Sequence, residues 1–115
     1  MSPYFNYHKS DIIPGIEHNE NYGYEELSRC ITIGNIQKIQ IMITIQGADI
    51  NATDDMGYTL LMKAVQFGRL EIVKLLLQHG AQVNVKNQAG MTALDYAIER
   101  NRQDIQEILL NAGAR

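Results

Sequence analysis

The amino-acid sequence predicts an all-α solenoid of about three helix-turn-helix repeats, preceded by an irregular N-terminal arm. The main observation is a period of 33 residues in the second half of the chain. Glycines also separate short amphipathic runs at matching places in each period. Such a period is typical of stacked units that cannot bury their apolar faces alone. The pairs that show it are Gly57/Gly90, Thr59/Thr92, Leu61/Leu94, Ala64/Ala97 and Ile72/Ile105.

The central unit resembles an ankyrin repeat. It reads Gly-Tyr-Thr-Leu-Leu-Met-Lys-Ala over 57–64, then continues from Gly68 through a leucine-rich run to Gly80-Ala81. The resemblance covers residues 24–115, as units at about 24–56, 57–89 and 90–115. It implies helix pairs joined by projecting β-turn fingers at 49–58 and 82–91. It also implies protein binding without catalysis.

Residues 1–23 match no repeat and are predicted to form the irregular arm. Prolines and glycines interrupt them, at Pro3, Pro14, Gly15 and Gly23. The apolar residues are nevertheless too many for a purely solvating tail: Tyr4, Phe5, Tyr7, Ile12, Ile13, Ile16 and Tyr22. Two interpretations stay open, because the arm could cover the exposed side of the first repeat or dock a partner.

The first repeat carries conflicting signals. Residues 39–45 alternate like a β-strand, and their β-branched side chains favour that state. The repeat register and the helical spacing of Ile36, Ile39 and Met42 favour a helix, which we expect because packing overrides weak propensity. Alignment on Gly34 also shows one residue inserted near the end of this helix. We expect it to be the least stable helix.

The second repeat is predicted to have helices near 59–67 and 69–78. Thr59 can cap the first of them with its hydroxyl oxygen. Where the family motif has proline and histidine, this chain has Leu60 and Met62. We therefore do not expect the hydrogen-bond network that the family histidine supports. Asn51 and Asn84 take matching finger positions, where their amides are expected to bond local backbone.

The third repeat is predicted to have helices near 92–100 and 102–111. Three of its positions are polar where the second repeat has Leu70, Val73 and Phe67. This is expected of a terminal repeat whose outer face meets water, and it predicts that the array stops here. The polar residues are Gln103, Gln106 and Arg100.

Composition excludes several classes of function. The net charge of −3 over 115 residues does not favour nucleic-acid binding. No apolar run is long enough to cross a membrane, and no signal peptide is evident. The single cysteine, Cys30, excludes an internal disulfide and is expected to be buried. The expected location is the cytoplasm, with secretion as a bacterial effector left open.

The sequence offers no candidate for catalysis, a metal or a cofactor. His8, His18 and His79 lack ligand-spaced partners. Asp54-Asp55 is an acidic pair in a turn, without the second group that acid–base catalysis needs. An enzyme is therefore not expected.

The resemblance implies a partner-binding surface on the finger tips and the first helix of each pair. An apolar strip of Met56, Tyr58, Phe67 and Met91 would lie there. The alternative for Tyr58 and Phe67 is packing within their own repeat. The full predicted set is Thr53, Asp55, Met56, Tyr58, Gln66 and Phe67 in the second repeat, with Lys86, Gln88, Ala89, Met91, Glu99 and Arg100 in the third.

These features predict a module that binds another protein, of unknown identity, through its concave finger-side surface. It would act as an adaptor or inhibitor, and as a monomer. The alternative is a structural protein that self-associates through the arm.

Overall fold

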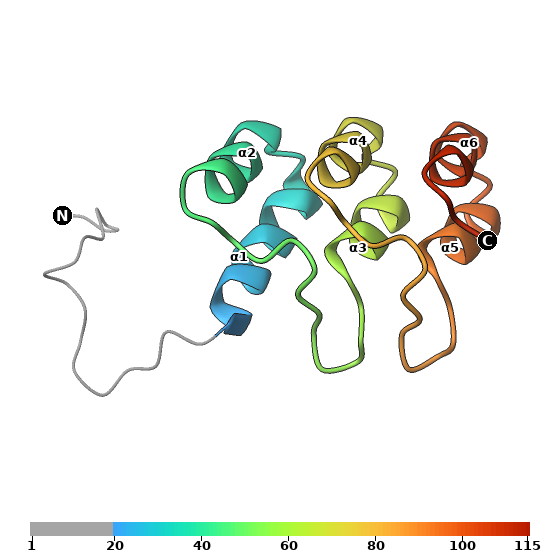
Figure 1. The fold of residues 1–115 in the computed structure, drawn as a ribbon, viewed down its shortest axis with the longest axis horizontal. Coiled ribbons are helices and arrows are strands. Elements are labelled where there is room, and N and C mark those ends of the chain that lie inside the picture. Colours follow the sequence, from blue (N-terminus) through green and yellow to red (C-terminus); the bar gives the residue numbers. More distant parts are fainter. Residues whose placement is uncertain (1–19) are drawn as a thin grey trace, which may run out of the picture.

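The computed structural model describes residues 20–115, which form six helices in a row of three pairs (Figure 1). Within this range the extended pairing is limited to one bridge, between Thr53 and Thr59. The all-α repeat class is therefore confirmed. The helices are α1 Glu20–Ile33, α2 Ile36–Thr44, α3 Leu60–Gln66, α4 Leu70–Gln78, α5 Ala93–Glu99 and α6 Gln103–Asn111.

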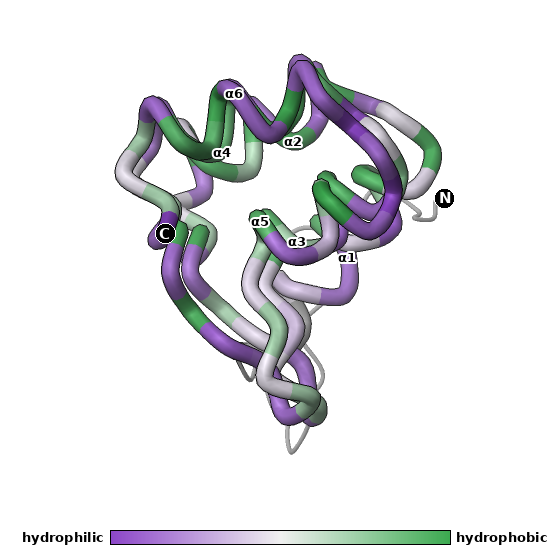
Figure 2. Tube along the Cα trace, turned by 90° about the vertical axis from the view of Figure 1, so that its right-hand side faces the viewer, coloured by the Kyte–Doolittle hydropathy of each residue, from purple (hydrophilic) through white to green (hydrophobic). Residues whose placement is uncertain are grey.

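The helices form two layers. One layer contains α1, α3 and α5, the other contains α2, α4 and α6, and each helix packs on its neighbours in its layer and on its partner. Figure 2 looks along the row and shows the two layers with the connections projecting beyond the first. The core between the layers includes Leu27, Leu61 and Leu76, and the expected burial of Cys30 is confirmed.

The first helix starts earlier than expected. Residues 20–23 belong to α1, so the end of the stretch predicted to be irregular is helical. In the later repeats Thr59 and Thr92 are N-cap residues, so the first helix of each pair begins directly after them. The first repeat has Glu25 at that position, a residue that continues a helix rather than capping it. The expectations for residues 1–19 lie outside the described residues.

The β-prone run in the first repeat is helical, as the repeat register predicts. Helix α2 buries Ile39 and Met42 on one face. It has nine residues, as α4 does, so the inserted residue lies just after the helix. There the N–H of Ala48 donates to the carbonyl of Met42 at 3.0 Å, six residues back, whereas at the end of α4 the N–H of Ala81 donates to the carbonyl of Leu76, five residues back.

Helix α3 keeps a side-chain N-cap although Leu60 and Met62 replace the proline and histidine of the family motif. Thr59 Oγ1 accepts from the N–H of Met62 at 3.1 Å, and the N–H of Thr59 donates to the sulfur of Met62 at 3.5 Å. Thr92 and Asp95 make the same reciprocal pair with a carboxylate. The departure from the family motif therefore leaves the helix start satisfied.

Side chains also join each repeat to the next. Arg69 reaches back to the end of α1, donating from Nε to the carbonyl of Ile31 at 3.2 Å and from Nη2 to that of Thr32 at 2.5 Å. Asn51 does not bond local backbone as expected. Its amide nitrogen donates to the carbonyl of Gly80 at 3.4 Å, and its oxygen accepts from the N–H of Gln82 at 2.9 Å.

Asn84 makes the equivalent bonds to Gly113 and Arg115. These two asparagines therefore act between repeats.

The last repeat has the polar outer positions that its sequence predicts. Gln103 and Arg100 are exposed, and Gln106 donates from its amide to the carbonyl of Ala97 at 3.3 Å. Two apolar side chains remain on this repeat, Ile98 and Leu110, which are 57% and 54% exposed.

Candidate protein-binding surface

Each finger is a turn fixed by one side chain. The carboxylate of Asp54 accepts from the N–H groups of Met56 at 3.0 Å and Tyr58 at 2.9 Å. Asn87 does the same for the third repeat, with Ala89 and Met91. Because the acceptor bonds backbone N–H groups two and four residues on, it stabilises this conformation of the finger tip. The tip residues are therefore presented by a rigid support.

The two fingers are bonded to each other. Gln88 donates from its backbone N–H to the carbonyl of Met56 at 3.0 Å and from Nε2 to the carbonyl of Asp55 at 2.9 Å. Gly57 permits this approach, because a Cβ atom there would lie 3.1 Å from Cα of Asn87. Gln88 is exposed, but its amide is already used within the array.

Tyr58 is largely a structural residue. Its ring stacks on that of Tyr96 with centroids 5.9 Å apart, and Nζ of Lys63 lies 5.4 Å from the Tyr58 centroid. The hydroxyl of Tyr96 donates to that of Tyr58 at 3.1 Å, and the amide of Asn87 donates to Tyr96 at 2.8 Å. The hydrogen bond with Tyr96 raises the pKa of Tyr58.

The predicted apolar strip is exposed mainly at two of its four residues. Met56 is 54% exposed and Phe67 is 46% exposed. Tyr58 and Met91 are partly buried and pack against the core. Phe67 is the C-cap of α3, where its backbone N–H donates to the carbonyl of Lys63 at 3.0 Å.

The polar residues of the predicted set come from the same fingers and first helices as these two side chains. All but Gln66 are exposed, and Gln66 is partly buried. Among residues 20–115, no ion pair involves any of the charged members. The exposed polar members are Thr53, Asp55, Lys86, Gln88, Glu99 and Arg100, and the apolar Ala89 of the set is also exposed.

One apolar residue of this surface was missed by sequence reasoning. Ile33 is exposed and precedes Gly34 as Phe67 precedes Gly68, so it ends α1 as Phe67 follows the end of α3. The alignment of the two glycines contained this signal. The first repeat therefore supplies an apolar residue at the position that Phe67 and Arg100 take in the later repeats.

The described part of the chain shows no grouping of three metal-ligating side chains. His79 is exposed at the end of α4, and His8 and His18 lie outside the described residues. Two open hollows, each of about 500 Å³, lie near Ala81–Val85 and near Gly68–Ile72. Neither is lined by a residue of the predicted binding set.

Comparison with protein families identifies the repeat. The family described as ankyrin repeats, in three copies, matches residues 27–115. The chain is an ankyrin repeat protein. Ankyrin repeats are generally protein–protein interaction modules, and the family is typically not enzymatic. A search of curated proteins found no match for this ankyrin repeat chain. No helix within residues 20–115 has the length and apolar character needed to cross a membrane.

Proposed function

We propose that this ankyrin repeat protein binds another protein through the concave, finger-side surface and acts as an adaptor or inhibitor. The observation that carries the proposal is the pair of large exposed apolar side chains, Met56 and Phe67, on a support held by hydrogen bonds. Exposed apolar side chains with a polar rim are the usual composition of a binding site. Asp55, Lys86 and Arg100 supply that rim.

The rigid support favours affinity. The finger at 49–58 is fixed by Asp54 and the finger at 82–91 by Asn87, and Gln88 joins the two. A surface that is already ordered loses little conformational entropy when a partner binds. The contribution of each contact then depends on how well it is desolvated, and the apolar pair is expected to dominate.

The proposal is tested by affinity capture from cell lysate with the double variant Met56→Ala/Phe67→Ala. The matched control is Ile98→Ala/Leu110→Ala, which removes an equally exposed apolar pair from the last repeat. We expect the first variant to lose the partner and the control to retain it. Circular dichroism checks that both are folded. Unchanged recovery by a folded Met56→Ala/Phe67→Ala variant overturns the proposed surface.

Tyr58 is a poor choice for this test. Its ring contacts Tyr96 and Lys63, so Tyr58→Ala would disturb the packing between repeats as well as any partner contact.

We also propose that the protein acts as a monomer in the cytoplasm. The buried, unpaired thiol of Cys30 supports a reducing location. The alternative, self-association through the arm, predicts a molecular mass that rises with concentration. Light scattering over a hundredfold range of concentration separates the two, because the monomer keeps one mass throughout.

A further inference from the structure

The outer helices have one flank that faces the N-terminal end of the array. In α4, the buried Ile72 lines a hollow together with Gly34 and Ile36 of the first repeat, so it lies on this flank, and the buried Leu75 follows it about one turn later on the same face. The matching residues of α2 are Lys38 and Ile41, one helical turn apart. No helix of the described residues lies beside that flank of α2 (Figure 1).

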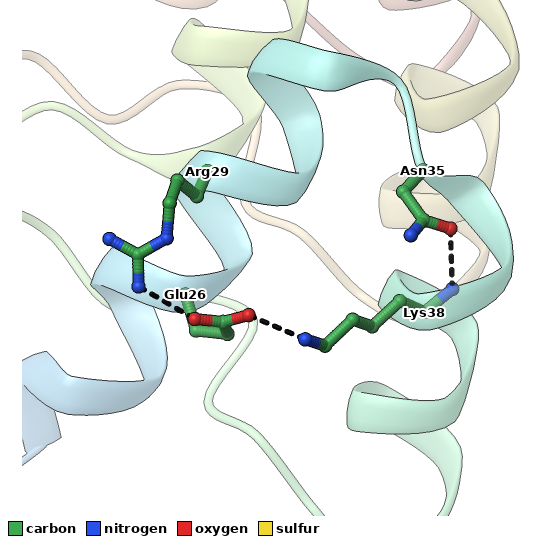
Figure 3. Close-up of polar contacts among 4 residues, drawn as sticks. All are labelled: Glu26, Arg29, Asn35 and Lys38. Carbon is green, nitrogen blue, oxygen red and sulfur yellow. Dashed lines mark hydrogen bonds and ion pairs between the residues drawn. The ribbon is translucent and has the colours of Figure 1, made fainter. Parts of the chain in front are cut away.

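A charged cluster covers part of the flank. Glu26 and Lys38 stand where the second repeat has the buried Leu60 and Ile72. Figure 3 shows Glu26 between two cations, with its carboxylate 2.6 Å from Nη2 of Arg29 and 2.6 Å from Nζ of Lys38. Asn35 fixes the start of α2, accepting from the N–H of Lys38 at 3.2 Å. These polar replacements suit a flank that does not receive another repeat.

Two isoleucines of the flank have no such replacement. Ile41 is 48% exposed although its counterpart Leu75 is buried. Ile45 lies one turn further along the same flank and is also exposed. The ion pair with Glu26 explains how Lys38 is accommodated on this open flank. It does not explain the exposure of Ile41 and Ile45.

We infer that residues 4–16 of the same molecule cover Ile41 and Ile45. This segment carries the apolar residues Tyr4, Phe5, Tyr7, Ile12, Ile13 and Ile16. It precedes α1, so it enters the array at the repeat whose flank is open. The inference is independent of the proposed function, because the flank contains none of the proposed partner-binding residues.

The chain is long enough for this contact. An extended chain covers roughly 3.3 Å per residue, so 19 residues reach about 60 Å. Helix α2 with nine residues is only about 14 Å long. Ile12 is eight residues from Glu20 and can reach roughly 26 Å from the start of α1, which packs against α2.

A double-mutant cycle in the full chain tests the contact. Ile41→Ser is expected to lower the ratio of folded to unfolded protein about fivefold, as measured by urea unfolding. In the background Ile12→Ser/Ile13→Ser/Ile16→Ser, the same change is expected to have no effect. The matched control is Ile98→Ser at the other end of the array, whose effect is expected to be equal in both backgrounds.

Isotope-edited NMR supplies the second measurement. With isoleucine methyl groups labelled, we expect cross-peaks between Ile41 and the isoleucines of residues 12–16 within one chain. Independent effects of Ile41 and the arm, without such cross-peaks, overturn the inference. Cross-peaks that arise only between differently labelled chains also overturn it, since they show the segment covering a second copy.

Discussion

The guanidinium group of Arg102 lies directly over Gly68, so closely that a Cβ atom there would come within 2.6 Å of Cζ of Arg102. Gly68 also has a positive φ of 67°. The residue is therefore held to glycine by two causes, the backbone conformation and the arginine of the next repeat.

The variant Gly68→Ala should separate these causes. We expect a loss of about 1–2 kcal/mol in the free energy of unfolding, because alanine strains the backbone and displaces Arg102. In the Arg102→Ala background the cost should fall to that of Gly90→Ala, where φ is 78° and no atom lies near the added Cβ. Urea unfolding measures all four variants. An equal cost of Gly68→Ala in both backgrounds would contradict a role for Arg102.

Arg69 should contribute more to stability than Arg102. Arg69 donates to two carbonyls at the end of α1, whereas Nε of Arg102 is buried without a hydrogen bond within the described residues. We expect Arg69→Met to cost about 1 kcal/mol, since it removes the donor to the Ile31 carbonyl in a part-buried bond, while the exposed carbonyl of Thr32 can bond water instead. Arg102→Met is the control and should cost less. Thermal unfolding of the pair checks the order, and a larger loss for Arg102→Met would contradict it.

Tyr24 should destabilise the fold at high pH. Its hydroxyl is buried without a hydrogen bond among the described residues, and burial followed by the charge of Asp54 raises its pKa above the ordinary 10.0. The folded state therefore holds the proton more tightly than the unfolded chain. The contribution of the protonated Tyr24 to the free energy of unfolding is then fully present below pH 10, and it is lost as the pH rises from 10 toward the pKa of the folded state.

The variant Tyr24→Phe should unfold less readily above pH 10 and lose no stability at pH 7. Urea unfolding between pH 7 and 11 measures this. A marked loss at pH 7 would show that the hydroxyl has a partner after all. Tyr58→Phe, which removes the hydrogen bond with Tyr96, is the matched control and should lose about 1 kcal/mol at pH 7.

Glu26 should give a small acid dependence. The hydrogen bond from Lys38, and then that from Arg29, lower the pKa of Glu26 below its ordinary 4.5. The cluster therefore adds stability above pH 4.5, which is lost as the pH falls through the folded pKa. Because the side chains are partly exposed, we expect Glu26→Gln to cost only about 0.5 kcal/mol at pH 7. The difference in stability between the variant and the wild type should shrink as the pH is lowered below 4.5, and a difference that stays constant would rule out the titration.

The repeat pattern was sufficient to predict most of the fold, because each helix start depends on a local signal. Thr59 and Thr92 lie in the sequence where the helices begin, and the glycines lie where they end. The predicted boundary at residue 23 between the irregular arm and the first repeat was wrong, because the first repeat has Glu25 in place of the capping threonine. No local residue then indicated that the helix continues back to Glu20.

The binding surface was less readable, because side-chain partners do not follow the period. Tyr58 was expected in the strip, but its partner Tyr96 is on the next repeat, where the second repeat has Lys63 instead of an aromatic residue. Asn51 was expected to act locally and instead bonds residues 29 and 31 positions away. Such contacts depend on how two repeats are placed, which the spacing of residues within one repeat does not determine.

The two hydrogen bonds from Gln88 to the finger at 49–58 have a mechanical consequence. Without these bonds, each finger could move independently when a partner contacts it. Because Gln88 is bonded to the carbonyls of Asp55 and Met56, movement of one finger tip is coupled to movement of the other. A partner is therefore expected to meet two tips held at a fixed spacing.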